Sequence, residues 1–407
     1  MSWNRNVIHH SIAYFAEKGN TFHRSFRFLT GFFLVEFDKM TKKRPCTSGK
    51  FTEMQKMRGG VKYYEKICKN GLTNTPFVGI IVGICWHLLH IYAEKSEYMK
   101  KIYIDGQAGT TGLRIRERLA ERDDVTVLTL PEDKRKDTDA RREIMNSVDF
   151  VFLCLPDAAA REAVTLIENP SVRVLDTSTA HRTNPAWAYG FPELDESFHE
   201  KIKTSNRIAV PGCHASGFIA LVRPLVQAGL LSPDAHLSAT SLTGYSGGGK
   251  NMIADYENSE RDPLLDAPRQ YALGQTHKHL PEMLAFTGLA NAPVFLPIVG
   301  DFYSGMEVTV PLFGADVKGA TPEDILAIYH KTYDGSPLVR VANADENGFL
   351  SAGSMTGKDS MEISVYGNPD RMILVARYDN LGKGASGAAV ECLNILLGAD
   401  PTSNLVV

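Results

Sequence analysis

The stretch MKKIYIDGQAGTTG, residues 99–112, joins a short apolar strand to a glycine-rich turn and the start of a helix. Its glycines follow the spacing G-x-x-G-x-x-G, which is one residue longer in its first gap than the usual dinucleotide fingerprint. Such a turn offers bare backbone N–H groups and a positive helix end to a phosphate, although glycine can also serve a turn for steric reasons alone. Its place at a strand–helix junction favours cofactor binding, with contacts expected from Gly106, Gly109, Thr110, Thr111 and Gly112.

Strands and helices alternate after this turn. The apolar patterns predict helices at about 111–122, 139–149 and 157–169, and strands at 125–130, 150–156 and 172–178. Strands that alternate with helices form βαβ units around a parallel sheet. The sequence therefore predicts an α/β fold with a Rossmann-type dinucleotide-binding domain.

The pattern changes beyond residue 235. Longer alternating strands are predicted at 236–242, 294–313 and 361–378, the last with a Gly-Asn-Pro-Asp turn, and one helix at 321–333 interrupts them. This predicts an α+β domain with a mainly antiparallel sheet. A helix rich in small residues at 385–398 closes the chain.

Composition excludes several classes of protein. The chain of 407 residues has a net charge of −3, which gives no reason to expect nucleic acid as a partner. Its six cysteines form no CxxC pair and no metal-ligand spacing, so we expect no metal site and no disulfide framework. This cysteine usage suits a reducing compartment, and we expect a cytoplasmic protein.

Residues 1–98 differ from the rest of the chain. They hold 15 lysines and arginines against 7 acidic residues, whereas the remainder holds 29 against 40. The uncharged run at 76–93 has the minimum length for a membrane-spanning helix; two histidines weaken it, whereas its two glycines would be tolerated in lipid. We expect a basic extension that is not part of the enzyme. A membrane-anchored enzyme is an alternative that we discount, because its charge bias would place the enzyme outside the cytoplasm.

The stretch IAVPGCHASGFIALVRPLV, residues 208–226, places Cys213 between a strand end and a helical pattern. Exposed N–H groups and the dipole at a helix N-terminus favour a thiolate. The alternative is a free cysteine that acts as a small buried hydrophobe. Cys213 is the candidate nucleophile.

Cofactor type depends on the stretch PEDKRKD, residues 131–137, which follows the second predicted strand. An acidic residue there favours NAD, whereas basic residues accommodate the additional phosphate of NADP. Basic residues outnumber acidic ones, so we predict NADP, with Arg135 at its phosphate. Pro156 and Ser178, at the ends of the next two strands, are further candidates for cofactor contact because ligands of such sheets bind at the carboxyl ends of the strands.

Four other polar residues are candidates for the site. Arg182 follows the fourth strand and suits an anionic substrate, and Lys250 ends a second glycine-rich loop, GYSGGGK. His277 and His279 lie in GQTHKHLPE, where a histidine could act as acid or base. Their separation by two residues on a loop disfavours a shared metal. A solvated surface arginine, a simple turn and a structural histidine are the respective alternatives.

Residues 99–398 resemble the N-acetyl-gamma-glutamyl-phosphate reductases of arginine biosynthesis, in their shorter type 2 form. Seven pieces match in order: DGQAGTTG, LDTSTAHR, YGFPE, PGCHASG, GYSGGGK, THKHLPE and DNLGKGASGAAV. The resemblance implies reduction of an acyl phosphate by NADPH through a cysteine thioester, with Cys213 as nucleophile and His277 as acid–base group. It also implies that Asn380 and Gly384 return to the cofactor. Arg182, Lys250 and His279 become candidates for substrate contact.

The resemblance implies a cofactor domain of residues 99–212 and 380–407, with a catalytic and oligomerisation domain at 213–379 inserted in it. It implies a homodimer or homotetramer acting on a small molecule. Two alternatives stay open: a reductase like aspartate-semialdehyde dehydrogenase, against which HKHLPE and GYSGGGK argue, and a non-catalytic NADP-binding regulator, which would not need Cys213 or His277.

Overall fold

The computed structural model describes residues 99–342 and 345–407. The chain divides into one unit of residues 1–99 and a second of residues 100–407. Our expectations for residues 1–98, including the apolar run at 76–93, therefore lie outside the described residues. Within the described part, none of the helices has both the length and the apolar character needed to cross a membrane.

Six parallel strands form the first sheet, in the order β2-β1-β3-β4-β6-β5. Their bounds are β1 Lys100–Asp105, β2 Val125–Leu128, β3 Phe150–Leu153, β4 Arg173–Asp176, β5 Ala188–Tyr189 and β6 Arg207–Ala209. All four residues of β3 are buried, because helices cover both faces of a parallel sheet, and this explains its unbroken apolar sequence. The predicted Rossmann-type alternation is confirmed.

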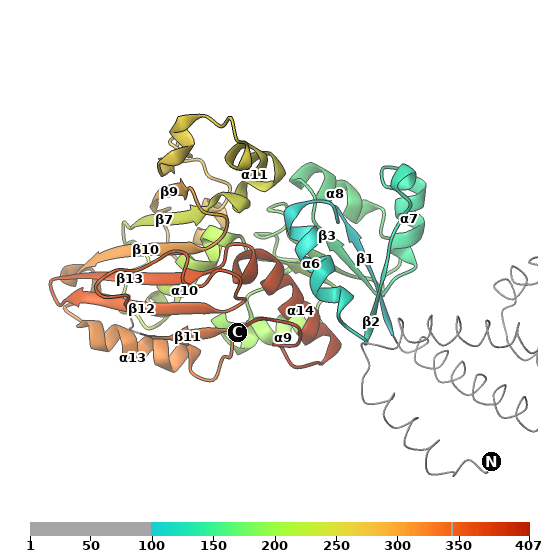
Figure 1. Ribbon diagram of the computed structural model, residues 1–407. Coiled ribbons are helices and arrows are strands. Elements are labelled where there is room, and N and C mark those ends of the chain that lie inside the picture. The colour runs from blue at the N-terminus through green and yellow to red at the C-terminus, as the bar shows by residue number, and fades with distance from the viewer. Residues whose placement is uncertain (1–98, 343–344) are drawn as a thin grey trace, which may run out of the picture. The chain divides into compact units, whose positions relative to one another are not determined.

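Five helices accompany this sheet: α6 Thr110–Ala120, α7 Thr138–Asn146, α8 Asp157–Thr165, α9 Glu196–Thr204 and α14 Gly387–Leu397. The last of them comes from the end of the chain, and Figure 1 shows it between the two sheets. Ala388, Ala389, Cys392 and Leu393 share one core with the strands β1, β3 and β6. The small residues of α14 therefore let the chain return to the first sheet after the second sheet is complete.

Seven strands form the second sheet, in the order β11-β12-β13-β10-β7-β9-β8. Their bounds are β7 Ser238–Gly244, β8 Arg269–Gln270, β9 Val294–Gly300, β10 Met306–Phe313, β11 Val339–Val341, β12 Met361–Asn368 and β13 Arg371–Tyr378. Four of the neighbouring pairs are antiparallel, whereas β7–β9 and β11–β12 are parallel. The mainly antiparallel sheet predicted from the sequence is confirmed.

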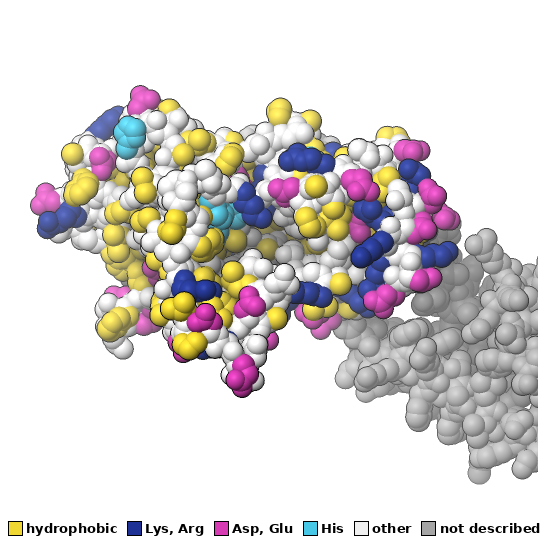
Figure 2. Space-filling model, turned by 90° about the horizontal axis from the view of Figure 1, so that it is seen from above, with side chains coloured by type: hydrophobic (Ala, Val, Ile, Leu, Met, Phe, Trp, Pro, Cys, Tyr) yellow, Lys and Arg dark blue, Asp and Glu magenta, His cyan; other side chains and the backbone are white. Residues whose placement is uncertain are grey.

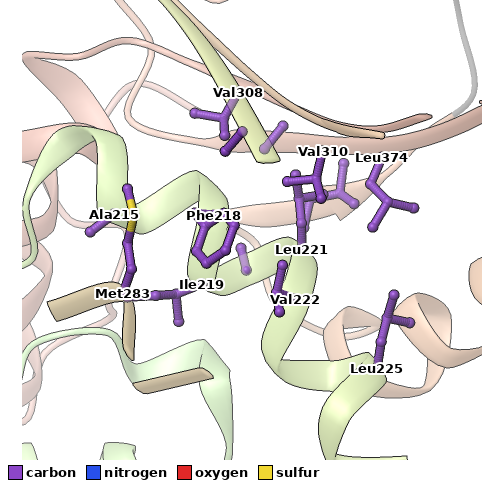
Figure 3. Packing of buried hydrophobic residues seen from close by; sticks show 14 of the residues in the cluster. Ala215, Phe218, Ile219, Leu221, Val222, Leu225, Met283, Val308, Val310 and Leu374 are labelled. Carbon is purple, nitrogen blue, oxygen red and sulfur yellow. The ribbon is translucent and has the colours of Figure 1, made fainter. Parts of the chain in front are cut away.

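The helix α10, Cys213–Gln227, fills the centre of this second half, accompanied by α11 Gly249–Glu257, α12 Leu280–Thr287 and α13 Pro322–Tyr333. Its apolar side chains face Val308 and Val310 of β10, Leu374 of β13 and Met283 of α12 (Figure 3). Burial on nearly every side explains why its sequence is apolar rather than amphipathic.

A proline inside α10 is compensated by a tyrosine of α13. Pro224 has no N–H, so it cannot donate to the carbonyl of Ala220 one turn earlier. The hydroxyl of Tyr333 donates to that carbonyl at 2.7 Å, and the hydroxyl of Tyr329 donates to the next carbonyl, that of Leu221, also at 2.7 Å. These bonds help to fix α10 against α13.

Candidate active site

Cys213 is the first residue of α10, and Gly212 is its N-cap. The predicted position at a helix N-terminus is therefore confirmed. No side chain caps this end, so the first N–H groups of α10 remain available near the thiol. Val210 N–H bonds to the carbonyl of Asp176 on β4 at 2.8 Å, which ties the entry to α10 to the first sheet.

Burial changes the expectation for the thiol. A helix end alone predicts a lowered pKa, but burial raises the pKa of the Cys213 thiol above its ordinary value. The positive charge of Arg182 and the backbone N–H of His214 act in the opposite direction, whereas the carboxylate of Glu282 adds to the increase. The site therefore stabilises the thiolate with an arginine and a backbone N–H while desolvating it.

Glu282, in the first turn of α12, holds the turn before the cysteine, and it was not among our candidates. Its carboxylate accepts from Gly212 N–H at 2.8 Å, from the hydroxyl of Tyr189 at 2.7 Å and from Arg182 Nη1 at 3.1 Å. A Cβ at position 212 would overlap this carboxylate, the Arg182 guanidinium and the imidazole of His279. The glycine of PGCHASG therefore lets three side chains close around the backbone next to Cys213.

Arg182 is buried, and its guanidinium group donates hydrogen bonds to other groups of the protein. Nε donates to the carbonyl of Val210 at 2.9 Å, Nη2 donates to the carbonyl of Thr177 at 2.9 Å, and Nη1 donates to Glu282. A guanidinium has five N–H donors, so two remain beyond these three bonds. The contact of Arg182 with an anionic substrate stays a prediction. In the structure its guanidinium group connects the end of β4 to the start of α10.

Three histidine rings meet beside Cys213. The ring centroid of His277 lies 4.7 Å from that of His279 and 5.4 Å from that of His214, and both pairs are nearly perpendicular. His214 lies next to Cys213 in the sequence and was not among our candidates. Its ring nitrogens lie 2.7 Å from the hydroxyls of Ser241 and Tyr271, so hydrogen bonds fix its ring.

All three imidazoles are neutral at neutral pH. Burial lowers the pKa of His214 to about 3 and that of His277 to about 4, with Lys278 and other nearby positive groups adding to the effect. Burial also lowers the pKa of His279 well below its ordinary value. The backbone N–H of His279 donates to His277 Nδ1 at 3.2 Å, which assigns the proton of the neutral His277 ring to Nε2.

His279 keeps one nitrogen unused. Its side chain is 5% exposed, and its Nδ1 is buried with no hydrogen-bond partner among the described residues. Buried polar atoms nearly always have a partner, so this atom is an unmet acceptor or donor, whereas the other ring nitrogen, Nε2, lies beside Gly212. On the face seen from the side of α8 and α11, basic and acidic side chains gather over the first-sheet half, and hydrophobic side chains are frequent over the second (Figure 2).

The glycine turn after β1 has the shape of a phosphate cradle. Gly106 has a φ of +84°, and a Cβ there would overlap the carbonyl of Cys154 at the end of β3. A Cβ at Gly112 would overlap the carbonyl of Gly106. Gly109 is the N-cap of α6 and supplies no side-chain cap, so the N–H groups of the first turn stay available. Gly106 and Gly112 are therefore required sterically, and the turn they allow leaves a positive helix end open.

Two unpartnered polar atoms lie in the predicted cofactor region. Thr110 Oγ1, at the start of α6, and Arg135 Nε are both buried without a hydrogen-bond partner among the described residues. Arg135 follows a short helical turn at Glu132–Lys134, and its Nη1 lies 3.4 Å from Glu132. Thr111 lies next to Thr110, within the first turn of α6.

The remaining cofactor candidates differ in how they are used. Pro156 is the N-cap of α8 without a side-chain cap, so that helix end is open as well. Ser178 donates to Asp176 at 2.7 Å and accepts from Ala180 N–H at 3.1 Å, and its hydroxyl thus organises the turn after β4.

Asn380 and Gly384 lie at the nucleophile end of the site. Asn380 Oδ1 accepts from Gly305 N–H at 2.9 Å and its Nδ2 donates to the hydroxyl of Ser246 at 3.0 Å, so the amide joins two loops of the second half. A Cβ at Gly384 would lie 3.0 Å from Cys213 Cβ, which shows direct packing of this glycine against the cysteine. The structure thus brings the DNLGKG segment to Cys213, with its amide bound to protein groups.

Lys250 is exposed in the first turn of α11, directly after Gly249 with a φ of +75°. No ion pair or hydrogen bond joins its ammonium group to another described residue. Ser246, in the same GYSGGGK segment, is bound to Asn380, which connects the loop to the DNLGKG segment. Lys250 stays a prediction for substrate contact.

Family comparisons agree with the two halves of the fold. Residues 88–204 match the NAD binding domain of the semialdehyde dehydrogenases, and residues 213–380 match their dimerisation domain. Solved structures with a similar fold include aspartate semialdehyde dehydrogenase II from Vibrio cholerae complexed with ASA. Its TM-score is 0.57 at 15% identity, over 74% of this chain and 98% of that one. The NADP-bound enzyme from Candida albicans has a TM-score of 0.53 at 15% identity, over 74% and 98% of the two chains.

Sequence relatives are closer. The N-acetyl-gamma-glutamyl-phosphate reductase of Brucella ovis is 46% identical over 306 residues, which cover 73% of this chain and 99% of that protein. The enzyme of the same name from Rhizobium leguminosarum bv. trifolii is 46% identical over 307 residues, with 74% and 99% coverage. This identity over nearly their whole length, together with the semialdehyde dehydrogenase domains, shows that the chain belongs to the N-acetyl-gamma-glutamyl-phosphate reductase family.

Proposed function

We propose that the protein reduces N-acetylglutamyl 5-phosphate to N-acetylglutamate 5-semialdehyde and phosphate, with NADPH as the reductant, in arginine biosynthesis. The observation that carries this proposal is the position of Cys213. It begins a buried helix at the carboxyl edge of the first sheet, next to an arginine and three neutral histidines. The relatives at 46% identity supply the substrate, because the site geometry alone indicates only acyl transfer through a thiol.

The residues of the first sheet fit a dinucleotide. The open first turn of α6 and the unpartnered Thr110 Oγ1 suit a pyrophosphate, and the cradle formed by Gly106 and Gly112 excludes any side chain from its floor. Arg135 has a buried nitrogen without a partner, and its neighbours Lys134 and Lys136 are exposed, which favours the additional phosphate of NADP. When bound, the nicotinamide supplies a hydride to the carbonyl carbon held on the protein.

Cys213 supplies the covalent step. Its thiolate attacks the acyl carbon, the carbon–oxygen bond to phosphate breaks, and phosphate leaves with the electron pair. A thioester remains on the sulfur. After hydride addition the carbon carries an oxyanion, and cleavage of the carbon–sulfur bond then releases the semialdehyde and restores the thiolate.

His277 is the proposed acid–base group. Its Nε2 carries the proton because Nδ1 accepts a backbone N–H, so the ring can donate to the oxyanion that forms on the acyl carbon. The proton is shared with the oxyanion in this hydrogen bond and stays with Nε2 when the oxyanion collapses and the electron pair of the carbon–sulfur bond returns to the sulfur, so no imidazolate forms. We assign His279 to substrate contact through its unpartnered nitrogen, and Lys250 to an anionic group of the substrate. Arg182 acts on the thiol by its charge, and its two remaining N–H groups are candidates for the same anionic groups.

We propose that residues 99–212 and 380–407 hold the cofactor and that residues 213–379 carry catalysis and oligomer contacts. A homodimer or homotetramer is supported by the match to a dimerisation domain. Half-buried apolar residues on β9, Leu296 and Ile298, alternate with buried neighbours along that strand and offer an outer face to a second copy. We assign the protein to the cytoplasm on its cysteine usage, and residues 1–98 to an extension without a catalytic part.

The test is phosphate-dependent reduction of NADP, followed by absorbance, with N-acetylglutamate semialdehyde and with aspartate semialdehyde as separate substrates. We expect turnover with the first substrate and a dependence on phosphate. Preference for aspartate semialdehyde would instead support the activity named for the proteins of similar fold. Cofactor binding without turnover of either substrate would support a regulator.

A further inference from the structure

Tyr378 ends β13, and its hydroxyl lies within the first turn of α10. The hydroxyl donates to the carbonyl of Cys213 and accepts from Gly217 N–H at 3.0 Å. These are the two groups that a regular α-helix joins directly across one turn. A Cβ at position 217 would lie 2.7 Å from the hydroxyl oxygen, so glycine leaves the space that the tyrosine occupies. The phenol is thus wedged into the turn that begins with the nucleophile.

The carbonyl held by Tyr378 belongs to the same peptide unit as the N–H of His214. A peptide unit is planar and trans, so fixing the direction of its C=O also fixes the direction of its N–H. That N–H is one of the groups that favour the thiolate of Cys213. A hydrogen bond to the carbonyl also polarises the unit and strengthens its N–H as a donor.

We propose that Tyr378 is a positioning residue for the nucleophile, whose hydroxyl orients the Cys213–His214 peptide so that its N–H stays directed at the sulfur. This inference deepens the proposed function and rests on Cys213 being the nucleophile. Tyr378 is fully buried, and burial, with the nearby Cys213 charge, raises its pKa well above the ordinary value. The phenol therefore keeps its proton and remains a donor while the thiol titrates.

Two other tyrosines make the same kind of bond to the same helix at a distance from the cysteine. The hydroxyls of Tyr329 and Tyr333 donate to the carbonyls of Leu221 and Ala220, and both side chains are buried. Tyr329 is the closer control, because Tyr333 also compensates for Pro224. A purely structural role predicts the same behaviour for Tyr378→Phe and Tyr329→Phe.

The experiment measures alkylation of Cys213 by iodoacetamide in the full chain, across the pH range in which a thiol titrates, with the modified peptide quantified by mass spectrometry. Peptide mapping separates Cys213 from Cys154 and Cys392, and burial raises the pKa of both of those thiols. We expect the Tyr378→Phe curve to move to higher pH by about one unit, which is about tenfold less thiolate at a fixed lower pH. The Tyr329→Phe curve should coincide with that of the unmodified protein.

A second variant keeps the test decisive if Tyr378→Phe does not fold. Replacement of Tyr378 by 3-fluorotyrosine makes the phenol a stronger donor with little change in shape, and should move the alkylation curve to lower pH. The same replacement at Tyr329 should not move it. The proposal is overturned if the alkylation curves of the Tyr378 and Tyr329 variants coincide, either for the two phenylalanine replacements or for the two 3-fluorotyrosine replacements. These curves require no substrate, so they remain informative even if the proposed activity proves wrong.

Discussion

Replacement of Glu282 by glutamine should make the protein less stable and its nucleophilic thiol more reactive. The Oε1 atom of glutamine can still accept from Gly212 N–H and from the Tyr189 hydroxyl, which bind the carboxylate at 2.8 and 2.7 Å. The amide nitrogen would face Arg182 Nη1, now 3.1 Å from a carboxylate oxygen, so two donors would meet. The arginine would remain buried without its counter-charge.

Removing one partner of a buried ion pair costs about 3–5 kcal/mol of unfolding free energy. Arg182 keeps two carbonyl partners, Val210 and Thr177, so we expect a loss at the lower end, about 3 kcal/mol. For a folded unit of this size each kcal/mol corresponds to about 2 °C, so the melting temperature should fall by about 6 °C. Glu200→Gln is the control: its carboxylate is exposed on α9, 3.3 Å from Lys203, and such pairs contribute about 0–1 kcal/mol.

The reactivity of the Cys213 thiol should increase in this variant, although the stability of the protein decreases. Besides burial, the negative charge of Glu282 raises the pKa of Cys213, whereas the positive charge of Arg182 lowers it, so removing the carboxylate removes one of the two raising effects. Iodoacetamide should therefore alkylate Cys213 of Glu282→Gln faster than that of the unmodified protein at neutral pH. Calorimetry and peptide mass spectrometry give the two readouts. A variant that melts as high as Glu200→Gln, or one whose Cys213 reacts more slowly, would refute this account of the site.

Four further outcomes follow from the proposed chemistry. Cys213→Ser should abolish turnover and leave NADPH binding intact, since a hydroxyl stays protonated at neutral pH; residual semialdehyde oxidation above a trace would exclude the thioester. His277→Asn should lower kcat by about 10²–10⁴, and His279→Asn should lower it less or act on KM; the reverse order would exchange their roles. Arg135→Ala should weaken NADPH much more than NADH in a binding titration, and equal weakening would remove it from the phosphate. A chain that begins at Met99 should fold, bind NADPH and turn over normally, and an inactive or insoluble product would give residues 1–98 a part in the enzyme.

The order of strands and helices is readable from this sequence because local patterns determine it. The helix at 321–333 has a capping box in which Thr321 and Asp324 each accept from the other's backbone N–H, and Pro322 follows the cap. Elements with weak local signals were not predicted. The helix α9 buries only Ile202 fully and is polar apart from Ile202 and the partly buried Phe198, and β8 is two exposed residues that pair with β9.

The contacts that define the site are long-range, and no local pattern contains them. Asn380 reaches Ser246 and Gly305 across 134 and 75 residues of sequence, and Gly212 meets Glu282 across 70. The motif THKHLPE does offer one signal for Glu282, an acid at a proline-initiated helix start beside the histidines. The raised thiol pKa could not be read from the helix end, because burial comes from packing against the second sheet and the segment around Gly384.

The chain crosses between the two sheets twice, and both crossings contact Cys213. The first runs from β6 through Gly212 into Cys213, and the second runs from Tyr378 on β13 to Gly384, which packs against Cys213. Two strips of backbone that join the sheets therefore meet at this cysteine. A substitution in either strip should change the position of the sulfur as well as the connection between the sheets, and the rate at which Cys213 is alkylated would report that change.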